Sequence, residues 1–597
     1  MDQMCGIAGE IAFRRHAADQ GPVARMVEVM DVRGPDGEGS WTNGWVALGH
    51  RRLTVIDLSD AGAQPMHDPH LGLTIVFNGC IYNYPQLRAE LGGEFTFSST
   101  SDTEVILKAY ARWGEDFVDH LVGMFAVAIV DERRSCVVLA RDRLGIKPLY
   151  VAELPGRLRF ASTLPALVAG GGIDTTIDEV ALHHYLSWHS IVPAPRTILR
   201  GVRKVPPATV SVIHSDGSRY DRVFWKPDYV RTAATERWTA EEWQDAIHAA
   251  LRTAVQRRLV SDVPVGVLLS GGVDSSLIVA LLAELGQQPV STFSIGFDSA
   301  GGEQGDEFQY SDLVASTYGT DHHRIRIDSN EIVPAVGDTI SAMTEPMGTQ
   351  DVTGFYLLSK TVSEHIKVVQ SGQGAAEVFA GYAYHQPAGS ASRASALETF
   401  RGAFLDRTHD RMSDVVEPEW LCPTDVSREL LETHLDAPGA ETALDAVLRL
   451  DTHLLLVDDP VKRVDSMTMA WGLEARVPFL DQDVVELAAH CPPELKATQG
   501  GKGILKDVAR KVLPSSIIDR PKGYFPVPPL KYLGEPLLSE VSDALHAPEA
   551  KQRGLFRPDY VEELLAAPNA NFSPGGNNLL WQLGVLEMWL QRHRIPA

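Results

Sequence analysis

Short apolar runs separated by turn-forming residues make up the first third of the chain. Residues 71–79 and 123–131 are apolar, rich in β-branched side chains and bounded by turn formers, so we expect β-strands there. Residues 101–113, between them, have helical spacing, because their apolar positions recur on one face. Strands on both sides of such a helix predict layered α and β structure and not a small sandwich.

A different pattern begins near residue 240. Residues 238–259 form a long amphipathic stretch, and residues 262–270 have the character of a buried strand that leads into a glycine loop. The stretch 577–594 has the spacing of an amphipathic helix, whose Trp and Leu residues we expect in the core. The content of Gly, Ser, Pro and Ala predicts loops at 299–307, 384–394 and 566–578.

This change of pattern predicts a domain boundary between residues 215 and 240, where a turn and a last strand precede a linker. Long helices around a few strands follow it, which indicates α/β structure in the second half as well. The chain is therefore expected to be a two-domain α/β protein. We place the first domain at 5–215, the linker at 216–240 and the second domain at 241–597.

The chain is strongly acidic, with 54 Lys and Arg against 78 Asp and Glu and a net charge of −24. Such a surface repels nucleic-acid phosphates and anionic lipids, so we expect neither as a main partner. No apolar stretch approaches the ~20 residues that span a bilayer, and no basic segment followed by an apolar run opens the sequence. The five cysteines are scattered, without disulfide or zinc-site spacing, which favours a reducing cytoplasm.

The strongest local signal is the motif SGGVDSS at 270–276, between the expected strand and an apolar helix. Gly271 and Gly272 let backbone N–H groups approach an anion, while Asp274 and Ser275 begin a helix whose N-terminus favours negative charge. The motif is not the GxxxxGK[ST] loop of simple nucleotide hydrolysis. It resembles the pyrophosphate loop of ATP pyrophosphatases, in which the residue matching Asp274 binds magnesium. A plain βα turn, with glycine for steric reasons and Ser and Asp for capping, rarely demands the whole motif.

A second group of motifs lies in the N-terminal part. It comprises Cys5-Gly6-Ile7, RGPDG (33–37), GHRRLTVIDLS (49–59), FNGCIYNYPQLR (77–88), SDTEVIL (101–107) and RDRLGIKPLY (141–150). Together these motifs resemble the glutaminase domain of class II amidotransferases, which has the αββα fold of Ntn hydrolases. Without them, Cys5 would more often be a small buried hydrophobic residue.

The resemblance implies a role for each matching residue. Cys5 would attack the side-chain amide of glutamine, with its own α-amine as base, as in N-terminal-nucleophile enzymes. Asn78 and the backbone of Gly79 would form the oxyanion hole, where such donors matter most. Arg52 and Asp102 would bind the carboxylate and the amine of glutamine, and Asn78 would also contact this substrate.

Two positions depart from that pattern. Residues 1–4 precede Cys5, and while they are attached Cys5 has no free amine. Translation from Met4 with removal of that methionine, another cleavage, or a silent glutaminase would each account for them, and we expect the first. Cys80 stands where asparagine synthetases usually have a glutamate that helps to bind the donor's amine, so the donor need not be held identically.

Further motifs extend the resemblance to asparagine synthetases over nearly the whole chain: TFSIGF (292–297), TEPM (344–347), SGQGAAEVFAGY (371–382), RVDSMTMAWGLEARVPFLD (463–481), GKGILK (501–506) and RPKGYFPVP (520–528). They imply an α/β ATP-pyrophosphatase domain that uses ATP and Mg²⁺. Lys502, which by itself would be a solvated loop lysine, would stabilise charge in the acyl-transfer step, and Lys522 would stabilise the departing pyrophosphate. The resemblance places ATP against Leu268, Ser270, Gly271, Gly272, Asp274, Ser275, Ile295, Ser371, Gly372 and Lys522.

The implied reaction begins with attack of a carboxylate on the α-phosphorus of ATP, which gives an acyl-adenylate and pyrophosphate. Ammonia, brought through an internal tunnel, then displaces AMP. SGQGAAE departs from the usual SGEGADE, because Gln373 replaces an acidic residue thought to act as base and Ala376 replaces a metal- or pyrophosphate-binding Asp. Loss of a general base typically costs ~10²–10⁴ in rate, and Glu377 stands nearby as a catalytic candidate. Asp274 is left to bear more of the metal site.

The acceptor is expected to be a small carboxylic acid, and the donor glutamine or a γ-glutamyl amide analogue. FNGCIYNYP together with SGQGAAEVFAGY resembles the N-acetylglutaminylglutamine amidotransferases, which amidate a small dipeptide, although that branch keeps an Asp where this chain has Ala376. A relative in specialised metabolism could amidate another acid or transfer hydroxylamine from a γ-glutamyl hydroxamate. A regulatory or binding protein with a degenerate synthetase site, and a cyclase like β-lactam synthetase, are further alternatives. The sequence leaves a homodimer open.

Overall fold

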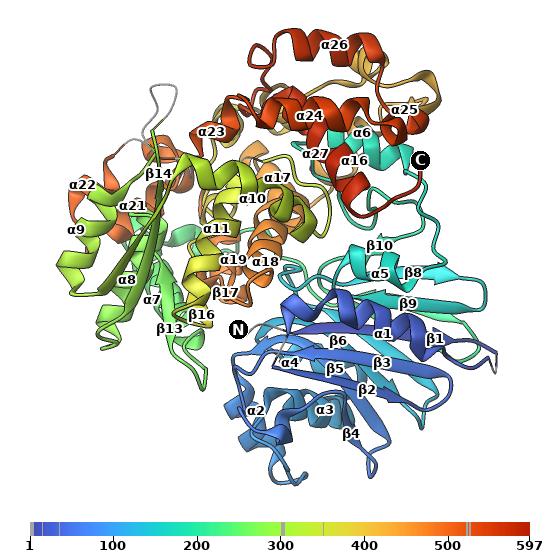
Figure 1. Cartoon of the computed structure of the whole chain (residues 1–597). Helices are drawn as coiled ribbons and strands as arrows, with labels where there is room; N and C mark the ends of the chain where they lie inside the picture. Colours follow the sequence, from blue (N-terminus) through green and yellow to red (C-terminus); the bar gives the residue numbers. More distant parts are fainter. Residues whose placement is uncertain are drawn as a thin grey trace.

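The computed structural model describes residues 5–14, 16–34, 36–299, 305–349, 351–520, 523 and 527–597 (Figure 1). The N-terminal part, blue to cyan in Figure 1, contains antiparallel sheets, and the remainder contains a parallel sheet enclosed by helices. The expected two-domain α/β architecture is confirmed. Among the described residues, no helix combines the length and the apolar character needed to cross a lipid bilayer.

Two six-stranded antiparallel sheets stack in the N-terminal part. One contains, in spatial order, β10 (Arg203–Lys204), β8 (Tyr150–Leu154), β9 (Arg157–Ala161), β1 (Gly6–Ala12), β3 (Val46–Arg52) and β2 (Gly37–Thr42). The other contains β12 (Arg219–Val223), β11 (Thr209–His214), β7 (Cys136–Arg141), β6 (Gly123–Asp131), β5 (Leu73–Ile81) and β4 (Met66–Asp68). Apolar side chains from both sheets, such as Ile7, Leu48, Val76 and Ala126, form one buried cluster between them.

Helices cover the outer faces, which completes the αββα order. α1 (Gln20–Val29) and α5 (Leu164–Gly170) pack on the first sheet, and α2 (Tyr84–Leu91) and α3 (Asp102–Trp113) pack on the second. The expected strands at 71–79 and 123–131 are β5 and β6, which pair antiparallel along their length. α3 corresponds to the predicted helix at 101–113, and its apolar side chains from Val105 to Tyr110 lie buried in one cluster with those of β5.

The second part is built on a five-stranded parallel sheet. Its order is β15 (Asp321–Ile327), β14 (Ser291–Phe297), β13 (Val265–Leu268), β16 (Val368–Gln370) and β17 (Glu474–Arg476). α7 and α8 pack in one apolar cluster with the sheet, and α10 and α11 pack in another. These four helices are α7 (Ala240–Arg257), α8 (Val273–Glu284), α10 (Ser329–Ala342) and α11 (Asp351–Ser363). The C-terminal helix is α27 (Leu579–Arg592).

α7 shows why the sequence pattern predicted this part well. A capping box begins the helix: the Thr239 side chain accepts a hydrogen bond from the Glu242 amide, and the Glu242 carboxylate accepts one from the Thr239 amide. Trp243, Ile247 and Leu251 then recur every fourth residue and are about 1% exposed, so a single face packs onto the sheet. The predicted helix at 577–594 is α27, and its Trp and Leu residues from Leu580 onward are buried as expected.

One local prediction is wrong. Residues 384–394 are not a loop, because η5 (Ala383–His385), α13 (Gln386–Ser390) and η6 (Arg393–Ser395) occupy them. The small residues pack here: Ala388 is 2% exposed, and His385 Nε2 lies 2.6 Å from Asp451 Oδ2 in the core. Tertiary packing therefore overrides the composition. Residues 300–304 of the expected loop 299–307 lie outside the described residues, while 566–578 connects α26 (Pro558–Ala566) to α27 as predicted.

The two parts meet across buried charges of opposite sign. Arg33 Nη2 and Lys147 Nζ, from the first part, lie 3.0 and 3.1 Å from the two carboxylate oxygens of Asp465 in the second. Lys204 Nζ lies 2.6 Å from Asp458 Oδ1. All five side chains are at most 5% exposed. Because a buried charge that loses its partner typically costs about 3–5 kcal/mol, these pairs fix how the two parts dock.

Candidate functional site

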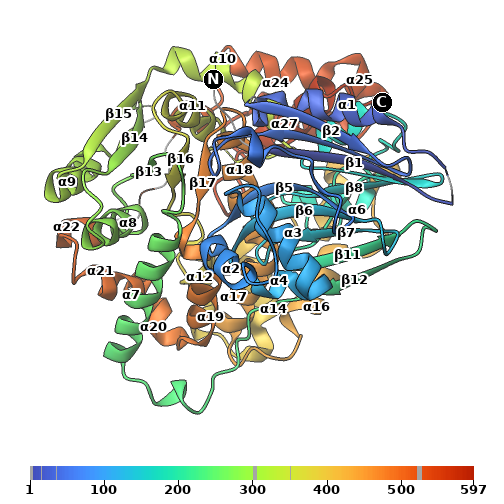
Figure 2. The ribbon, with the colours of Figure 1, turned by 90° about the horizontal axis from the view of Figure 1, so that it is seen from below.

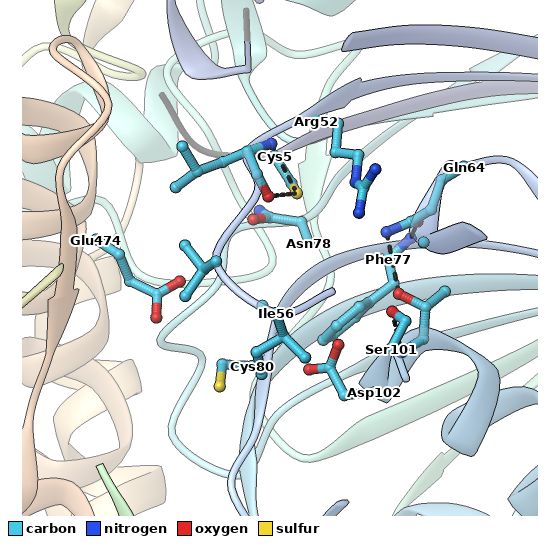
Figure 3. Close-up of a pocket in the computed structure, with 15 residues that line it drawn as sticks. Cys5, Arg52, Ile56, Gln64, Phe77, Asn78, Cys80, Ser101, Asp102 and Glu474 are labelled. Atoms are coloured by element: carbon cyan, nitrogen blue, oxygen red, sulfur yellow. Dashed lines mark hydrogen bonds between the residues drawn. The ribbon is translucent and has the colours of Figure 1, made fainter. Parts of the chain in front are cut away.

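A cavity, partly open to solvent, lies at the edge of the N-terminal sheets that faces the parallel sheet (Figure 3). Seen from below, β17 is the strand of the parallel sheet that comes nearest to this edge (Figure 2). Five residues that the sequence predicts for glutamine chemistry line the cavity together: Cys5, Arg52, Asn78, Gly79 and Asp102.

The strands place these side chains. Cys5 directly precedes β1, which pairs with β3 so that Gly6 faces Arg51, and this brings Cys5 beside Arg52. Asn78 and Gly79 lie in β5. Gly79 has φ +154°, and a Cβ there would lie 2.0 Å from the Met124 carbonyl oxygen, so the strands can approach this closely only with glycine.

The Cys5 thiol is held against the backbone of β3. Its Sγ lies 3.5 Å from the Leu53 amide nitrogen, which donates to it. Burial raises the pKa of the Cys5 thiol to about 11, and the negative charge of Glu474 adds to this rise. The thiol is therefore protonated at neutral pH, and a nucleophilic role requires a base.

Two polar groups in the cavity are poised for a ligand. Within the described part of the chain, neither Nδ2 nor Oδ1 of the buried Asn78 side chain has a hydrogen-bond partner. Leaving such a group unpaired costs about 1–3 kcal/mol, which a ligand would recover. The Arg52 guanidinium donates to the backbone oxygens of Ser59, at 2.8 Å, and of Asp57, so it is oriented without a carboxylate from the described residues to neutralise it.

Two carboxylates face the same cavity. Asp102 Oδ2 accepts a hydrogen bond from the Ile81 amide at 3.0 Å. Burial raises the pKa of Asp102 to about 7, and the charge of Glu474 contributes. Glu474 comes from β17 of the second part, is 2% exposed and pairs with Arg476 at 2.6 Å. The thiol of Cys80 lies in the same lining and offers no negative charge of its own at neutral pH, because burial raises its pKa well above the usual value.

Among the lining residues that sequence reasoning missed are Gln64 and Glu474. Gln64 accepts a hydrogen bond from the Phe77 amide at 2.6 Å and donates to Thr103 Oγ1 at 3.2 Å, which braces the strand that carries Asn78. Glu474 lies within the quoted motif at 463–481, but that motif was assigned to nucleotide chemistry. No sequence signal shows that a residue of the second part lines a cavity of the first.

A second cluster of predicted residues lies at the carboxyl ends of the parallel strands. After β13, the chain adds β14 and β15 on one side of this strand. It then crosses over, and β16 pairs with the other side of β13. The position between β13 and β16 is thus a topological switch point, where open α/β sheets bind ligands. The residues that meet here are Leu268, Ser270, Gly271, Gly272, Asp274 and Ser275, which end β13 and begin α8, together with Ser371 and Gly372, which follow β16.

The glycine loop is compact. Gly271 has φ +73°, and a Cβ there would lie 2.6 Å from the Ser311 amide nitrogen, so only glycine fits. Ser275 Oγ accepts from the Ser270 amide at 3.2 Å and lies 3.1 Å from Ser270 Oγ. Gly372 packs directly against the loop, because a Cβ on it would lie 2.9 Å from Asp274 Cβ. The result is a narrow cradle of backbone N–H groups that suits phosphate.

Asp274, the predicted magnesium ligand, uses only one of its two carboxylate oxygens in contacts with the described residues. Lys502 Nζ lies 2.6 Å from Asp274 Oδ2, whereas Asp274 Oδ1 is buried and has no hydrogen-bond partner in the described part of the chain. Mg²⁺ commonly binds through one or two carboxylates together with substrate phosphates. The donor set therefore fits Mg²⁺ only if phosphate supplies further ligands, since Ala376 supplies none.

The remaining candidates are placed less favourably. Ile295 lies half-buried in β14, the neighbouring strand, and Gln373 lies half-buried after Gly372. Glu377 is 2% exposed, and its Oε1 accepts a hydrogen bond from the Tyr382 hydroxyl at 2.7 Å. Burial and the charge of Asp451 raise the pKa of Glu377. Lys522 lies outside the described residues.

Arg520 is a cation beside the loop that sequence reasoning did not single out. Its Nη2 lies 2.8 Å from Glu307 Oε1 and 3.7 Å from the position of a Cβ on Gly272. The guanidinium also stacks 4.2 Å from the Tyr310 ring centroid. An anion in the cradle would thus face Arg520 as well as Lys502. The motif at 520–528 contains Arg520, but its spacing alone did not separate it from Lys522.

Comparison with known proteins covers nearly the whole chain. Residues 246–591 match the protein family described as asparagine synthase, and residues 4–225 match a glutamine amidotransferase domain. Asparagine synthetase (glutamine-hydrolyzing) 1 of Bacillus subtilis strain 168 is 31% identical, with 98% of this chain and 96% of the relative covered. Asparagine synthetase B of Escherichia coli K12 is 30% identical, with 96% of this chain and 94% of the relative covered. Amidase chry2 of Gibberella zeae is 31% identical, over 64% of this chain and 59% of the relative.

Proposed function

The chain belongs to the glutamine-hydrolysing asparagine synthetase family and is a glutamine-dependent amidotransferase, and on that premise we propose that it amidates a small carboxylic acid through an acyl-adenylate. A small peptide such as N-acetylglutaminylglutamine is the proposed acceptor. The observation that carries this proposal is the coexistence of two preorganised centres in one rigidly docked chain. One centre presents a thiol and the Asn78 amide, and the other presents an anion cradle and Asp274 Oδ1. Neither the amide nor this oxygen has a hydrogen-bond partner among the described residues.

In the first centre, Cys5 Sγ attacks the side-chain amide carbon of glutamine. The α-amine of Cys5, once residues 1–4 are removed, takes the thiol proton, which the raised pKa makes necessary. Asn78 Nδ2 and the Gly79 amide donate to the oxyanion that forms. Ammonia leaves as the thioester forms, and water then releases glutamate and restores the thiol.

Charge complementarity orients the donor. Arg52, which pairs with no carboxylate in the part of the chain that the structure describes, binds the α-carboxylate of glutamine. We assign the α-ammonium group to Asp102 and Glu474, which both face the cavity. The two carboxylates repel each other, which adds to the effect of burial in raising the pKa of Asp102, and a cation between them would relieve that repulsion. Glu474 would thereby supply negative charge that Cys80 does not.

This assignment predicts a pH dependence. Asp102 is largely protonated below pH 7 and ionised above it, and only the ionised form attracts an ammonium group. We therefore expect KM for glutamine to fall by roughly tenfold from pH 6 to pH 8. KM for ATP over the same range, measured on the same protein, serves as the control. A KM for glutamine that is flat over this range would contradict the role of Asp102.

In the second centre, the acceptor carboxylate attacks the α-phosphorus of ATP, and pyrophosphate leaves. The family uses ATP, generally with Mg²⁺, which when bound would neutralise phosphate charge. Asp274 Oδ1 would hold the ion, while Lys502, Arg520 and Lys522 would bind the negative charge of the phosphates and the departing pyrophosphate. Ammonia from the first centre then attacks the acyl carbon, and AMP leaves.

The acceptor-dependent products test the proposal. Purified full-length protein, incubated with glutamine, ATP and a panel of acids that includes N-acetylglutaminylglutamine, should form glutamate, AMP and pyrophosphate in equal amounts. ADP and inorganic phosphate as products would contradict an acyl-adenylate. Absence of pyrophosphate release with every acid would instead favour a regulatory protein with a degenerate synthetase site.

Gln373 favours a second candidate function. A neutral amide stands where the family usually has an acidic residue thought to act as base, so proton removal from the attacking nitrogen is not assisted there. Hydroxylamine is a stronger nucleophile than ammonia and depends less on such a base. Comparing glutamine with its γ-hydroxamate as donors separates the two functions. Faster product formation with the hydroxamate would assign hydroxylamine transfer.

A further inference from the structure

We propose that His183, His409 and Asp425 form a binding site for a divalent transition-metal ion of the zinc class, separate from both centres described above. One ligand atom from each residue lies within 4.8 Å of the others. His183 Nε2 and His409 Nδ1 are 3.1 Å apart. Zinc binds imidazole nitrogen at ~2.0–2.1 Å, so two ligands of a tetrahedral ion lie about 3.3 Å apart, close to the observed separation.

Hydrogen bonds around Ser427 prepare His183 as a ligand. Ser427 Oγ accepts from Trp188 Nε1 at 3.0 Å, and it also contacts Nδ1 of His183 at 3.1 Å and Nδ1 of His184 at 3.2 Å. A hydroxyl has one proton, so it can donate to only one of these imidazoles and must accept from the other. If Ser427 donates to His184, then His183 donates from Nδ1, and the lone pair of its Nε2 points toward His409.

This arrangement is the one that metal-binding histidines use. Such residues almost always donate their second ring N–H to a hydrogen-bond acceptor, which fixes both the tautomer and the ring orientation. His183 is 4% exposed and Ser427 is 1% exposed, so the imidazole is held by packing as well as by the hydrogen bond. The competing arrangement needs no ion: His409 Nδ1–H would simply donate to His183 Nε2.

Asp425 can contribute an oxygen without losing its present contacts. Its Oδ1 accepts from the Arg428 amide at 2.9 Å, and its Oδ2 accepts from Arg401 Nη2 at 3.0 Å, which leaves a second lone pair on each oxygen. Arg401 also lies 3.2 Å from Glu398 Oε2, so it keeps a partner if Asp425 turns toward an ion. The Asp425 side chain is 21% exposed, which gives an ion a route in.

The ligand set selects the ion. Two imidazoles and one carboxylate suit zinc, cobalt, nickel or ferrous iron, whereas magnesium and calcium prefer oxygen ligands throughout. The site would also cross-link the chain. His183 lies on α6 (Glu179–Ser187), whereas His409 lies on η7 (His409–Arg411) and Asp425 caps α16 (Val426–Leu435), in the second part. A bound ion would therefore link α6 to η7 and to the start of α16.

Zinc titration of the full-length protein tests the site. The Cys5→Ala background removes a competing thiol, and chelator treatment followed by dialysis removes bound metal. Calorimetry with zinc chloride should show one site per chain that His409→Ala eliminates, and cobalt should give visible d–d absorption without a thiolate charge-transfer band. Zinc should also raise Tm in the parent and not in His409→Ala.

Two further variants keep the test decisive. Asp425→Asn preserves the helix cap, because Asn caps as well as Asp, and should weaken zinc binding at least about tenfold. His546→Ala removes a histidine that lies 2.8 Å from Glu562 on the surface and should leave zinc binding unchanged. Equal zinc affinity and stoichiometry in the parent, His409→Ala and Asp425→Asn would overturn the proposal and leave a hydrogen-bonded histidine pair.

Discussion

Replacing Cys5 with alanine is expected to reduce glutamine-dependent product formation by at least about 10⁴-fold, because the nucleophile of the first centre is lost. With ammonium salt as nitrogen source, the same variant should form product at close to the parent rate, since the second centre is untouched. Glutamate release and product formation, measured side by side, check both expectations. Undiminished glutamine-dependent synthesis would disprove the proposed nitrogen source.

Cys422→Ala is the matched control for this variant. Cys422 is another buried thiol, 5% exposed, whose Sγ donates to the Glu179 carbonyl oxygen at 3.5 Å, far along the chain from the glutamine cavity. It should leave both activities unchanged. Mass spectrometry of the parent protein completes the test, because the mechanism requires Cys5 as the first residue. An active glutaminase with Met1 still attached would contradict the α-amine as base.

Replacing Asp274 with asparagine should give the opposite pattern. Asp274 Oδ1 is the free carboxylate oxygen beside the anion cradle, and the neutral amide would remove the proposed charge that holds Mg²⁺. We expect pyrophosphate release to fall on the order of a hundredfold or more with either nitrogen source. Glutamate release without acceptor should persist, because the glutamine cavity is unaltered.

Asp519→Asn is the control for charge loss. Asp519 pairs with Arg510 at 2.6 Å, the same separation as Asp274 and Lys502, but on an exposed surface where such a pair contributes little. It should leave both activities at the parent level. If Asp274→Asn kept full pyrophosphate release, the ion would have to be held elsewhere and the proposed second centre would be wrong.

The fold could be predicted where one face of an element is buried. α7 shows its helical spacing because its buried residues recur on one side. In α3 the apolar residues recur on the side that packs with β5, although the polar residues 102–104 are buried as well. β5 and β6 are apolar on both sides because they lie between layers. The prediction of a loop at 384–394 was wrong for the opposite reason. Its small residues have no periodicity of their own, and the pairing of His385 with the distant Asp451 holds it in short helices.

The site could be predicted residue by residue, but not as an assembly. Motifs identified Cys5, Asn78 and Asp102, which the structure places in one cavity. The contribution of Glu474 could not be predicted, because it depends on how the second part docks against the first. The pairing of Lys502 with Asp274 is likewise a contact between residues far apart in the sequence. Local sequence patterns do not show which residues far apart in the chain come into contact.

The short strand β17 reaches both centres. Glu474, at its start, lines the glutamine cavity, and the carbonyl oxygen of Arg476, at its end, accepts a hydrogen bond from the Ser371 amide at 2.8 Å in the nucleotide cradle. Three residues span only about 7 Å, too little for one end to move without the other. Occupancy of either centre would then alter affinity at the other by an equal factor, since thermodynamic linkage is reciprocal. A bound nucleotide would thereby change KM for glutamine, while glutamate release continues without an acceptor.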